Sequence, residues 1–380
     1  MASTNRMHLF AKRFKERGHD VEIVIPRATE NHRSTPLNFE TQGEYEGIPF
    51  RYSVNPVRSN SFIKRRWTDF TAYFKTIKYL IKTKRDSDIV MAMGINLDTM
   101  IACKIFCMLF NCKFVWEKNE LPFVFTEKNA AVKIYHIIFE KYVLKIFDGI
   151  ISISDSLHSY FKDKAGDKTM LLIIPILTDT SVFVPTRNNS GEIVYAGRLN
   201  QFKDGIFDLL NAYQMFSKNN PGRKLVLMGD INLSSNKDEI NKYIEANGLQ
   251  DKIEITGYVS REAMIERMNN AAVLVLAKPS NLQAEHCVPT KIAEYLSTGK
   301  PVLTTYSGSI PQFLTNEKDS YLTEPDNPVK LAEALDNIFN DYHKAEIVGI
   351  KGRQLAQDQF EYTRQGDKVL LFFSDLLQTA

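Results

Sequence analysis

The chain has 380 residues, of which 44% are hydrophobic and 24% are charged, and its formal net charge is +3 at pH 7. This composition excludes fibrous and disordered proteins, and the length predicts two domains of about 150 to 200 residues each. No apolar run reaches the length of a membrane span, and the four cysteines show no C-x-x-C spacing. We therefore predict a cytoplasmic protein with reduced thiols and no zinc site.

The first half of the chain alternates short β-branched segments with longer segments of helical periodicity. A first helix is predicted at 6–17, and it leaves no room for a strand before it. Strands follow at 21–25, 88–92, 113–116, 149–153 and 171–174, with helices at 64–85, 94–110, 126–147 and 155–164. This alternation predicts βαβ units around a parallel sheet, in a domain that lacks its first strand.

The helix at 64–85 is rich in both basic and apolar residues. Its lysines and arginines are interleaved with aromatic and aliphatic side chains such as Trp67, Phe70 and Phe74. One interpretation is a surface helix whose apolar stripe packs on the sheet while its lysines face water. The other is contact with anionic lipid headgroups at the inner face of the membrane, beside which a lipid-carried acceptor would dock. Nucleic acid is not a predicted partner, because no recognised motif accompanies the charge.

The second half repeats the pattern after a polar linker at 185–191. Strands are predicted at 192–196, 224–228, 252–255, 272–276, 302–305 and near Tyr321, with helices at 237–247, 260–269, 291–298 and 328–340. The fold class is α/β, with two Rossmann-like, doubly wound parallel-sheet domains that face each other across a cleft. The expected domains are 1–185, completed by a C-terminal helix at 360–380, and 191–358.

A first motif lies where the strand at 192–196 ends. Gly197 and Arg198 follow the strand, and Lys203 precedes the next helix. Two fixed cations beside free backbone amides suit a diphosphate. The alternative is a loop that carries two solvated cations.

A second motif surrounds the helix predicted at 291–298. Thr290 is predicted to be its N-cap, and Glu294 lies just past the first turn. The Glu294 carboxylate would accept hydrogen bonds from ribose hydroxyls while the helix N-terminus faces phosphate. In the alternative interpretation, Glu294 is a surface acid that stabilises the helix dipole by at most about 1 kcal/mol.

Together the two motifs resemble the retaining glycosyltransferases of GT-B fold, and specifically glycosyltransferase family 4. The resemblance implies that Arg198 and Lys203 bind the donor diphosphate and that Glu294 binds the ribose. It extends donor binding to a larger set, which comprises Gly197, Gly229, Val259, Glu285, His286, Thr290 and Lys291. His286 stands where the family has the first glutamate of a paired motif, and Glu285 is one residue away, so either residue would hold the transferred sugar.

The resemblance also implies an activity, which is transfer of a sugar from a nucleotide diphosphate donor to a glycan or lipid-linked acceptor. The anomeric configuration would be retained, and cell-surface polysaccharide synthesis is the expected context. Because Arg198, Lys203 and a helix N-terminus would stabilise the departing diphosphate, no cofactor and no essential metal are predicted. Glu120 is expected either to orient the acceptor hydroxyl or only to cap the next helix. A nucleotide-sugar epimerase of the same fold and a non-catalytic binding subunit are the alternatives.

Overall fold

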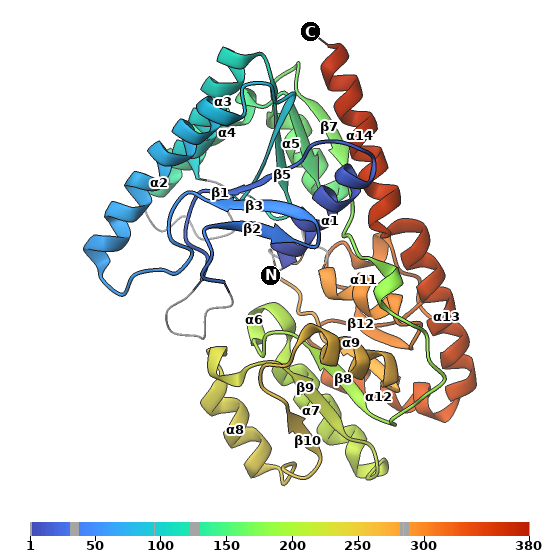
Figure 1. Cartoon of the computed structure of the whole chain (residues 1–380). Coiled ribbons are helices and arrows are strands. Elements are labelled where there is room, and N and C mark those ends of the chain that lie inside the picture. Colours follow the sequence, from blue (N-terminus) through green and yellow to red (C-terminus); the bar gives the residue numbers. More distant parts are fainter. Residues whose placement is uncertain are drawn as a thin grey trace. The chain divides into compact units, whose positions relative to one another are not determined.

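The computed structural model describes residues 2–30, 38–94, 96–121, 130–281, 284 and 289–379. The chain forms two compact units, of which unit 1 comprises Met1–Ile174 with Gln365–Ala380 and unit 2 comprises Pro175–Arg364. Each unit contains a parallel sheet with helices around it (Figure 1), so the predicted α/β class is confirmed. The domain limits 1–185 and 191–358 remain a prediction. Within the described residues, no helix combines the length and the apolar character needed to cross a bilayer.

Unit 1 begins with a helix and ends with the last helix of the chain. Its helices are α1 (Ala2–Glu16), α2 (Phe62–Thr83), α3 (Leu97–Phe110), α4 (Ala130–Tyr142), α5 (Asp155–Lys164) and α14 (Tyr362–Gln378), with a short 3-10 helix η1 (Val143–Ile146). Its strands are β1 (Ile23–Ile25), β2 (Gln42–Tyr45), β3 (Ile48–Tyr52), β4 (Ile89–Met93), β5 (Lys113–Lys118), β6 (Gly149–Ser152) and β7 (Met170–Ile173).

The main sheet of unit 1 has four parallel strands in the order β4-β5-β6-β7. Helices α3, α4 and α5 each connect two neighbouring strands, and right-handed crossovers place all three on one face. The other face is covered by α14, since a Cβ added at Gly149 in β6 would lie 2.8 Å from the ring of Phe372. Helix α1 joins α14 there through the Phe14–Phe373 ring contact and through ion pairs of Arg13 and Arg17 with Asp367.

A second, small sheet in unit 1 was not predicted in full. The strand predicted at 21–25 is confirmed as β1, but it pairs in parallel with β3 in a separate sheet of order β1-β3-β2. The hairpin β2–β3 escaped the sequence analysis because its strands hold Gly43 and Pro49 in place of a β-branched run. Its turn residues Glu46 and Gly47 have φ of 47° and 79°, as a tight two-residue hairpin turn requires.

Unit 2 contains the predicted second set of strands. They are β8 (Ile193–Ala196), β9 (Leu225–Met228), β10 (Ile253–Ile255), β11 (Val273–Leu276), β12 (Val302–Thr305) and β13 (Tyr321–Thr323). The helices are α6 (Gln201–Asp204), α7 (Ile206–Asn219), α8 (Lys237–Ala246), α9 (Arg261–Asn270), α11 (Thr290–Ser297), α12 (Pro328–Asn340) and α13 (Tyr342–Gln359), with 3-10 helices η2 (Thr180–Val182), η3 (Ile231–Leu233) and η4 (Ile310–Gln312).

The sheet of unit 2 has the order β10-β9-β8-β11-β12-β13, and all its pairings are parallel. Strands β8, β9, β11 and β12 are buried at every residue, because helices cover both faces of the sheet. The chain proceeds outward from β8 in one direction and from β11 in the other. The order therefore reverses between these two central strands.

Candidate functional site

The candidate site lies at the carboxyl ends of β8 and β11 in unit 2. These strands are neighbours, and the chain leaves them toward opposite sides of the sheet. In open α/β sheets, ligands bind outside the strand ends at this switch point. Both predicted motifs meet here, since one follows β8 and the other contains α11.

Two glycines bring the loops after β8 and β9 into backbone contact. The Gly197 amide donates to the Met228 carbonyl at 2.9 Å. A Cβ at Gly229 would collide with the Gly197 carbonyl, and a Cβ at Gly197, where φ is +152°, would collide with the Lys291 ammonium. The backbone contact excludes a side chain at Gly229, and the positive φ disfavours one at Gly197.

Lys291 connects the first turn of α11 to the loop that carries Arg198 and Lys203. Its Nζ donates to Asp204 Oδ1 at 2.5 Å and to the Tyr195 hydroxyl at 2.9 Å, and it lies 4.6 Å from the Tyr195 ring centroid. Burial lowers the pKa of Lys291, while the nearby Asp204 carboxylate opposes that shift. Lys291 thus forms an ion pair with Asp204, and this pair connects the two motifs.

Two buried tyrosines also connect α11 and the end of β8, and we refer to this contact region as the junction. The Ala196 amide donates to the Tyr295 hydroxyl oxygen at 2.7 Å, which fixes α11 against the end of β8. The Tyr195 hydroxyl donates to the Arg198 carbonyl. Burial raises the pKa of both phenols, so both stay neutral at physiological pH. Neither was predicted as a site residue, although Tyr195 lies in the strand predicted at 192–196 and Tyr295 lies in the helix predicted at 291–298.

Three cations follow the carboxyl ends of β8 and β11 in the chain. Arg198 is exposed, and its side chain makes no hydrogen bond or ion pair with the described residues. Lys203 also has an exposed side chain, and its carbonyl accepts a hydrogen bond from Lys278 Nζ at 2.8 Å. Lys278 is buried and was not predicted, but it follows β11 closely and so lies at the same sheet edge. The edge therefore carries more positive charge than the sequence indicated.

The start of α11 corrects the prediction for Thr290. The helix begins at Thr290 and its N-cap is Pro289, with φ of −64° and ψ of 124° and no side-chain cap hydrogen bond. The Thr290 hydroxyl is one residue too late to cap the helix, so the prediction was wrong. Among the described residues no side chain caps this first turn, and uncapped amides at a helix N-terminus are suited to an anion.

Glu294 lies beside Arg261, the first residue of α9. Both terminal nitrogens of Arg261 donate to Glu294 Oε1 at 3.2 Å. Val259 lies two residues before this helix, so Arg261 connects the segment that carries Val259 to Glu294. Arg261 itself was missed, because its partner is more than thirty residues away in the sequence. Glu285 and His286 lie outside the described residues.

The predicted acceptor residue belongs to unit 1. Glu120 is half-buried after β5, and its charge supports protonation of Lys118, whose pKa is lowered chiefly by burial. Nearby, the fully buried Glu117 accepts a hydrogen bond from Arg6 Nε at 2.6 Å. Burial raises the pKa of Glu117, and Arg6 opposes the shift. This ion pair joins α1 to β5 across 111 residues of sequence and was not predicted. The role of Glu120 stays a prediction.

Thiols, imidazoles and carboxylates are the side-chain groups that would hold a metal ion. In the part of the chain that the structure describes, no three or more His, Cys, Asp or Glu side chains form a group suited to an ion. Cys103, Cys107 and Cys112 are buried and free. Burial raises the pKa of Cys103 to about 12, so this thiol is protonated and unreactive at physiological pH.

Known proteins share the fold of this chain. Residues 180–355 match the family Glycosyl transferases group 1. No curated protein matches the chain in sequence. Sucrose-phosphate synthase from Thermosynechococcus elongatus has a TM-score of 0.74 at 16% identity, over 98% of this chain and 92% of that one. A glycosyltransferase from Rickettsia africae has a TM-score of 0.70 at 18% identity, over 99% and 95%. Anabaena HepE in complex with UDP-glucose has a TM-score of 0.65 at 16% identity, over 87% and 86%.

The fold and the matched domain together define a glycosyltransferase of GT-B fold. The chain carries a glycosyl transferases group 1 domain, which is the domain of glycosyltransferase family 4. This family uses nucleotide-sugar donors and retains the anomeric configuration. The resemblance predicted from the two motifs is therefore confirmed.

Proposed function

We propose that this enzyme transfers a sugar from a UDP- or GDP-sugar to a hydroxyl group of a glycan or a lipid-linked acceptor. The transfer proceeds with retention and contributes to cell-surface polysaccharide synthesis. UDP-sugars are the first donors to test, because the HepE structures contain UDP or UDP-glucose and a TarM structure contains UDP. The observation that carries the proposal is the junction of α11 with the loop after β8 through Lys291, Asp204 and Tyr195.

The donor diphosphate is proposed to lie between Arg198, Lys203 and the first turn of α11. The Lys291–Asp204 pair brings that turn against the loop, and neither Arg198 nor Lys203 is buried. As the bond to the sugar breaks, negative charge grows on the departing phosphate. Fixed cations and amides stabilise this charge without having to reorganise.

The nucleoside is proposed to extend toward Glu294 and Val259. Arg261 donates hydrogen bonds to Glu294 Oε1, whereas Glu294 Oε2 makes no hydrogen bond with the described residues. This second oxygen suits a ribose hydroxyl, and Arg261 holds the carboxylate in place. Glu285 or His286 would hold the transferred sugar, and Glu120 would orient the acceptor hydroxyl.

The test replaces each exposed cation by alanine. Arg198→Ala and Lys203→Ala should each lower turnover by about 100- to 1000-fold, the loss typical of one group that stabilises transition-state charge. Release of nucleoside diphosphate is measured for a panel of UDP- and GDP-sugars, and each variant is compared on the best donor. Lys330→Ala is the matched control, because Lys330 is 51% exposed at the start of α12 in the same unit. Wild-type rates in both site variants would exclude this phosphate site.

A further inference from the structure

Helix α2 of unit 1 turns its large apolar side chains toward solvent. Ile63, Trp67, Phe70 and Phe74 recur at steps of four, three and four residues, which places them on one face, and they are 79%, 66%, 57% and 54% exposed. The opposite face packs inward through the smaller Ala72, Thr76 and Leu80. The interpretation in which the apolar stripe packs on the sheet is therefore wrong for Trp67, Phe70 and Phe74.

The exposed aromatic rings form a continuous strip. The Trp67 and Phe70 ring centroids are 5.9 Å apart, and those of Phe70 and Phe74 are 5.0 Å apart. Single exposed apolar residues are ordinary on protein surfaces, but contiguous patches mark interaction sites.

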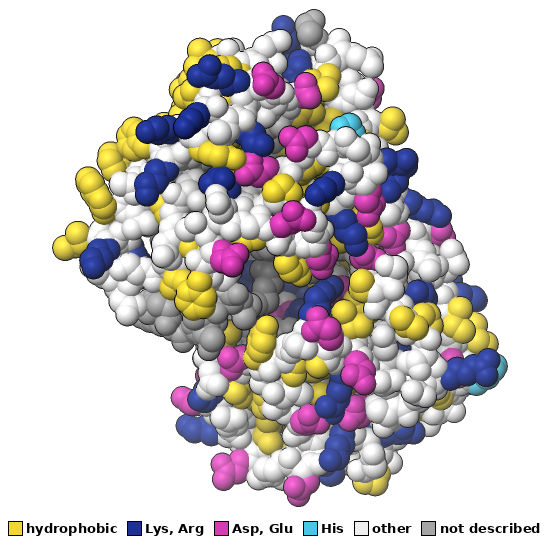
Figure 2. All heavy atoms as spheres, viewed as in Figure 1, with side chains coloured by type: hydrophobic (Ala, Val, Ile, Leu, Met, Phe, Trp, Pro, Cys, Tyr) yellow, Lys and Arg dark blue, Asp and Glu magenta, His cyan; other side chains and the backbone are white. Residues whose placement is uncertain are grey.

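Helices α3 and α4 extend the apolar surface. Their exposed apolar residues are Ile101, Ile105, Met108 and Leu109 in α3, and Ile134, Ile137, Ile138 and Tyr142 in α4. Helix α2 packs against α3, and the crossovers place α3 and α4 on the same face of the sheet. Figure 1 shows the three helices gathered at one edge of unit 1, and Figure 2 shows hydrophobic and basic side chains together along α2 and α3. We refer to these exposed stripes of α2, α3 and α4 as the apolar face.

Positive charge flanks the apolar face. The exposed basic residues of α2 are Lys64, Arg66, Lys75, Lys78 and Lys82. The acidic residues of the three helices offset little of this charge, because Asp98 is paired with Arg27, Glu140 is paired with Lys164, and Asp69 is half-buried.

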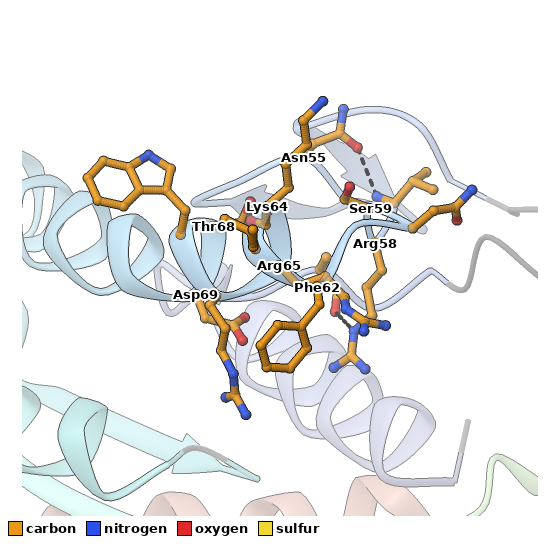
Figure 3. A pocket seen from close by; sticks show the side chains of 14 residues that line it. Asn55, Arg58, Ser59, Phe62, Lys64, Arg65, Thr68 and Asp69 are labelled. Carbon is orange, nitrogen blue, oxygen red and sulfur yellow. Dashed lines mark hydrogen bonds between the residues drawn. The ribbon is translucent and has the colours of Figure 1, made fainter.

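A hollow at the start of α2 adds to the basic character. It has a volume of about 920 Å³ and is lined by Arg58, Lys64, Arg65 and Arg66 among other residues. Figure 3 shows Arg58 from the preceding turn, with Lys64 and Arg65 from the first turn of α2. The cations thus collect at the end of the aromatic strip, where anionic headgroups would meet them.

We propose that the apolar face binds the surface of an anionic lipid bilayer. An aromatic stripe bordered by lysines is the pattern of helices that lie in the membrane interface, with rings at the acyl boundary and cations at the phosphates. A second copy of the chain fits less well, because a two-fold contact would set two basic borders against each other. This inference concerns unit 1 and does not depend on the donor site of unit 2.

The test measures cosedimentation of the full chain with vesicles of phosphatidylglycerol and phosphatidylcholine, and with vesicles of phosphatidylcholine alone. The wild type should bind the anionic vesicles at least tenfold more tightly. The aromatic variant Trp67→Ser/Phe70→Ser/Phe74→Ser should lose at least tenfold in affinity for them. The charge variant Lys75→Gln/Lys78→Gln/Lys82→Gln should lose about fivefold per residue.

The control variant Ile347→Ser/Ile350→Ser removes exposed apolar side chains of α13 and should bind as the wild type does. Thermal melts establish whether each variant is folded. If the aromatic variant is unfolded, the binding of the charge variant alone decides the result. Wild-type protein that stays in the supernatant would overturn the proposal. So would unchanged binding of the charge variant, or a wild-type dimer in sedimentation velocity that the aromatic variant abolishes.

Discussion

Helices of the two units differ in where they place their large apolar side chains. In unit 2, helix α7 buries Leu210 and Phe216 completely, whereas helix α2 of unit 1 leaves Trp67 and Phe74 more than half exposed. Both units also bury charged groups, since Lys278 is buried at the sheet edge of unit 2 and the ion pair of Arg6 with Glu117 is buried in unit 1. Buried polar groups and exposed apolar patches are the informative exceptions to ordinary burial. The exposed apolar face of unit 1 and the buried Lys278 of unit 2 are two such exceptions, and each lies where we propose that the unit binds a partner.

The largest expected effect comes from a matched pair of phenylalanines. Phe216→Ala in α7 should lower the free energy of unfolding by about 3 to 5 kcal/mol, because it leaves a cavity in a closed core. Phe74→Ala in α2 should change it by less than about 0.5 kcal/mol, because that ring already faces water. Urea unfolding followed by far-ultraviolet circular dichroism compares the two. A similar loss at both positions would remove the contrast between the units.

A smaller effect is expected at the partly buried pair in unit 2. Lys291→Met leaves Asp204 without its cation and should destabilise the protein by about 3 kcal/mol. Lys291→Met/Asp204→Leu should recover most of that loss, because no uncompensated charge remains. The free energies of unfolding of the single and double variants form a thermodynamic cycle. Strictly additive losses would show that the two motifs are not coupled through this pair.

The sequence predicted those elements whose pattern is local. The buried strands of unit 2 carry apolar runs such as Leu225–Met228 and Val273–Leu276, so their positions follow from composition alone. The hairpin β2–β3 is specified by a positive-φ turn and by pairing with β1, neither of which leaves a hydrophobic pattern. The direction of the α2 stripe was also hidden, since periodicity gives the width of an apolar face but not the side that is covered.

The candidate site was predicted in part for a similar reason. Gly197, Lys291 and Glu294 stand in motifs that can be found by their spacing. Lys278 and Arg261 act through partners 75 and 33 residues away, which only the folded chain brings together. Thr290 was misassigned by one residue, because Pro289 takes the N-cap position without offering a side-chain acceptor.

Calorimetric titration with UDP and with uridine tests the proposed diphosphate site most directly. The wild type should bind UDP much more tightly than uridine. Arg198→Ala/Lys203→Ala should lose at least tenfold of that preference, because charge-assisted hydrogen bonds contribute about 1.5 to 3 kcal/mol each. An equal preference for UDP in the wild type and the double variant would contradict the proposed site.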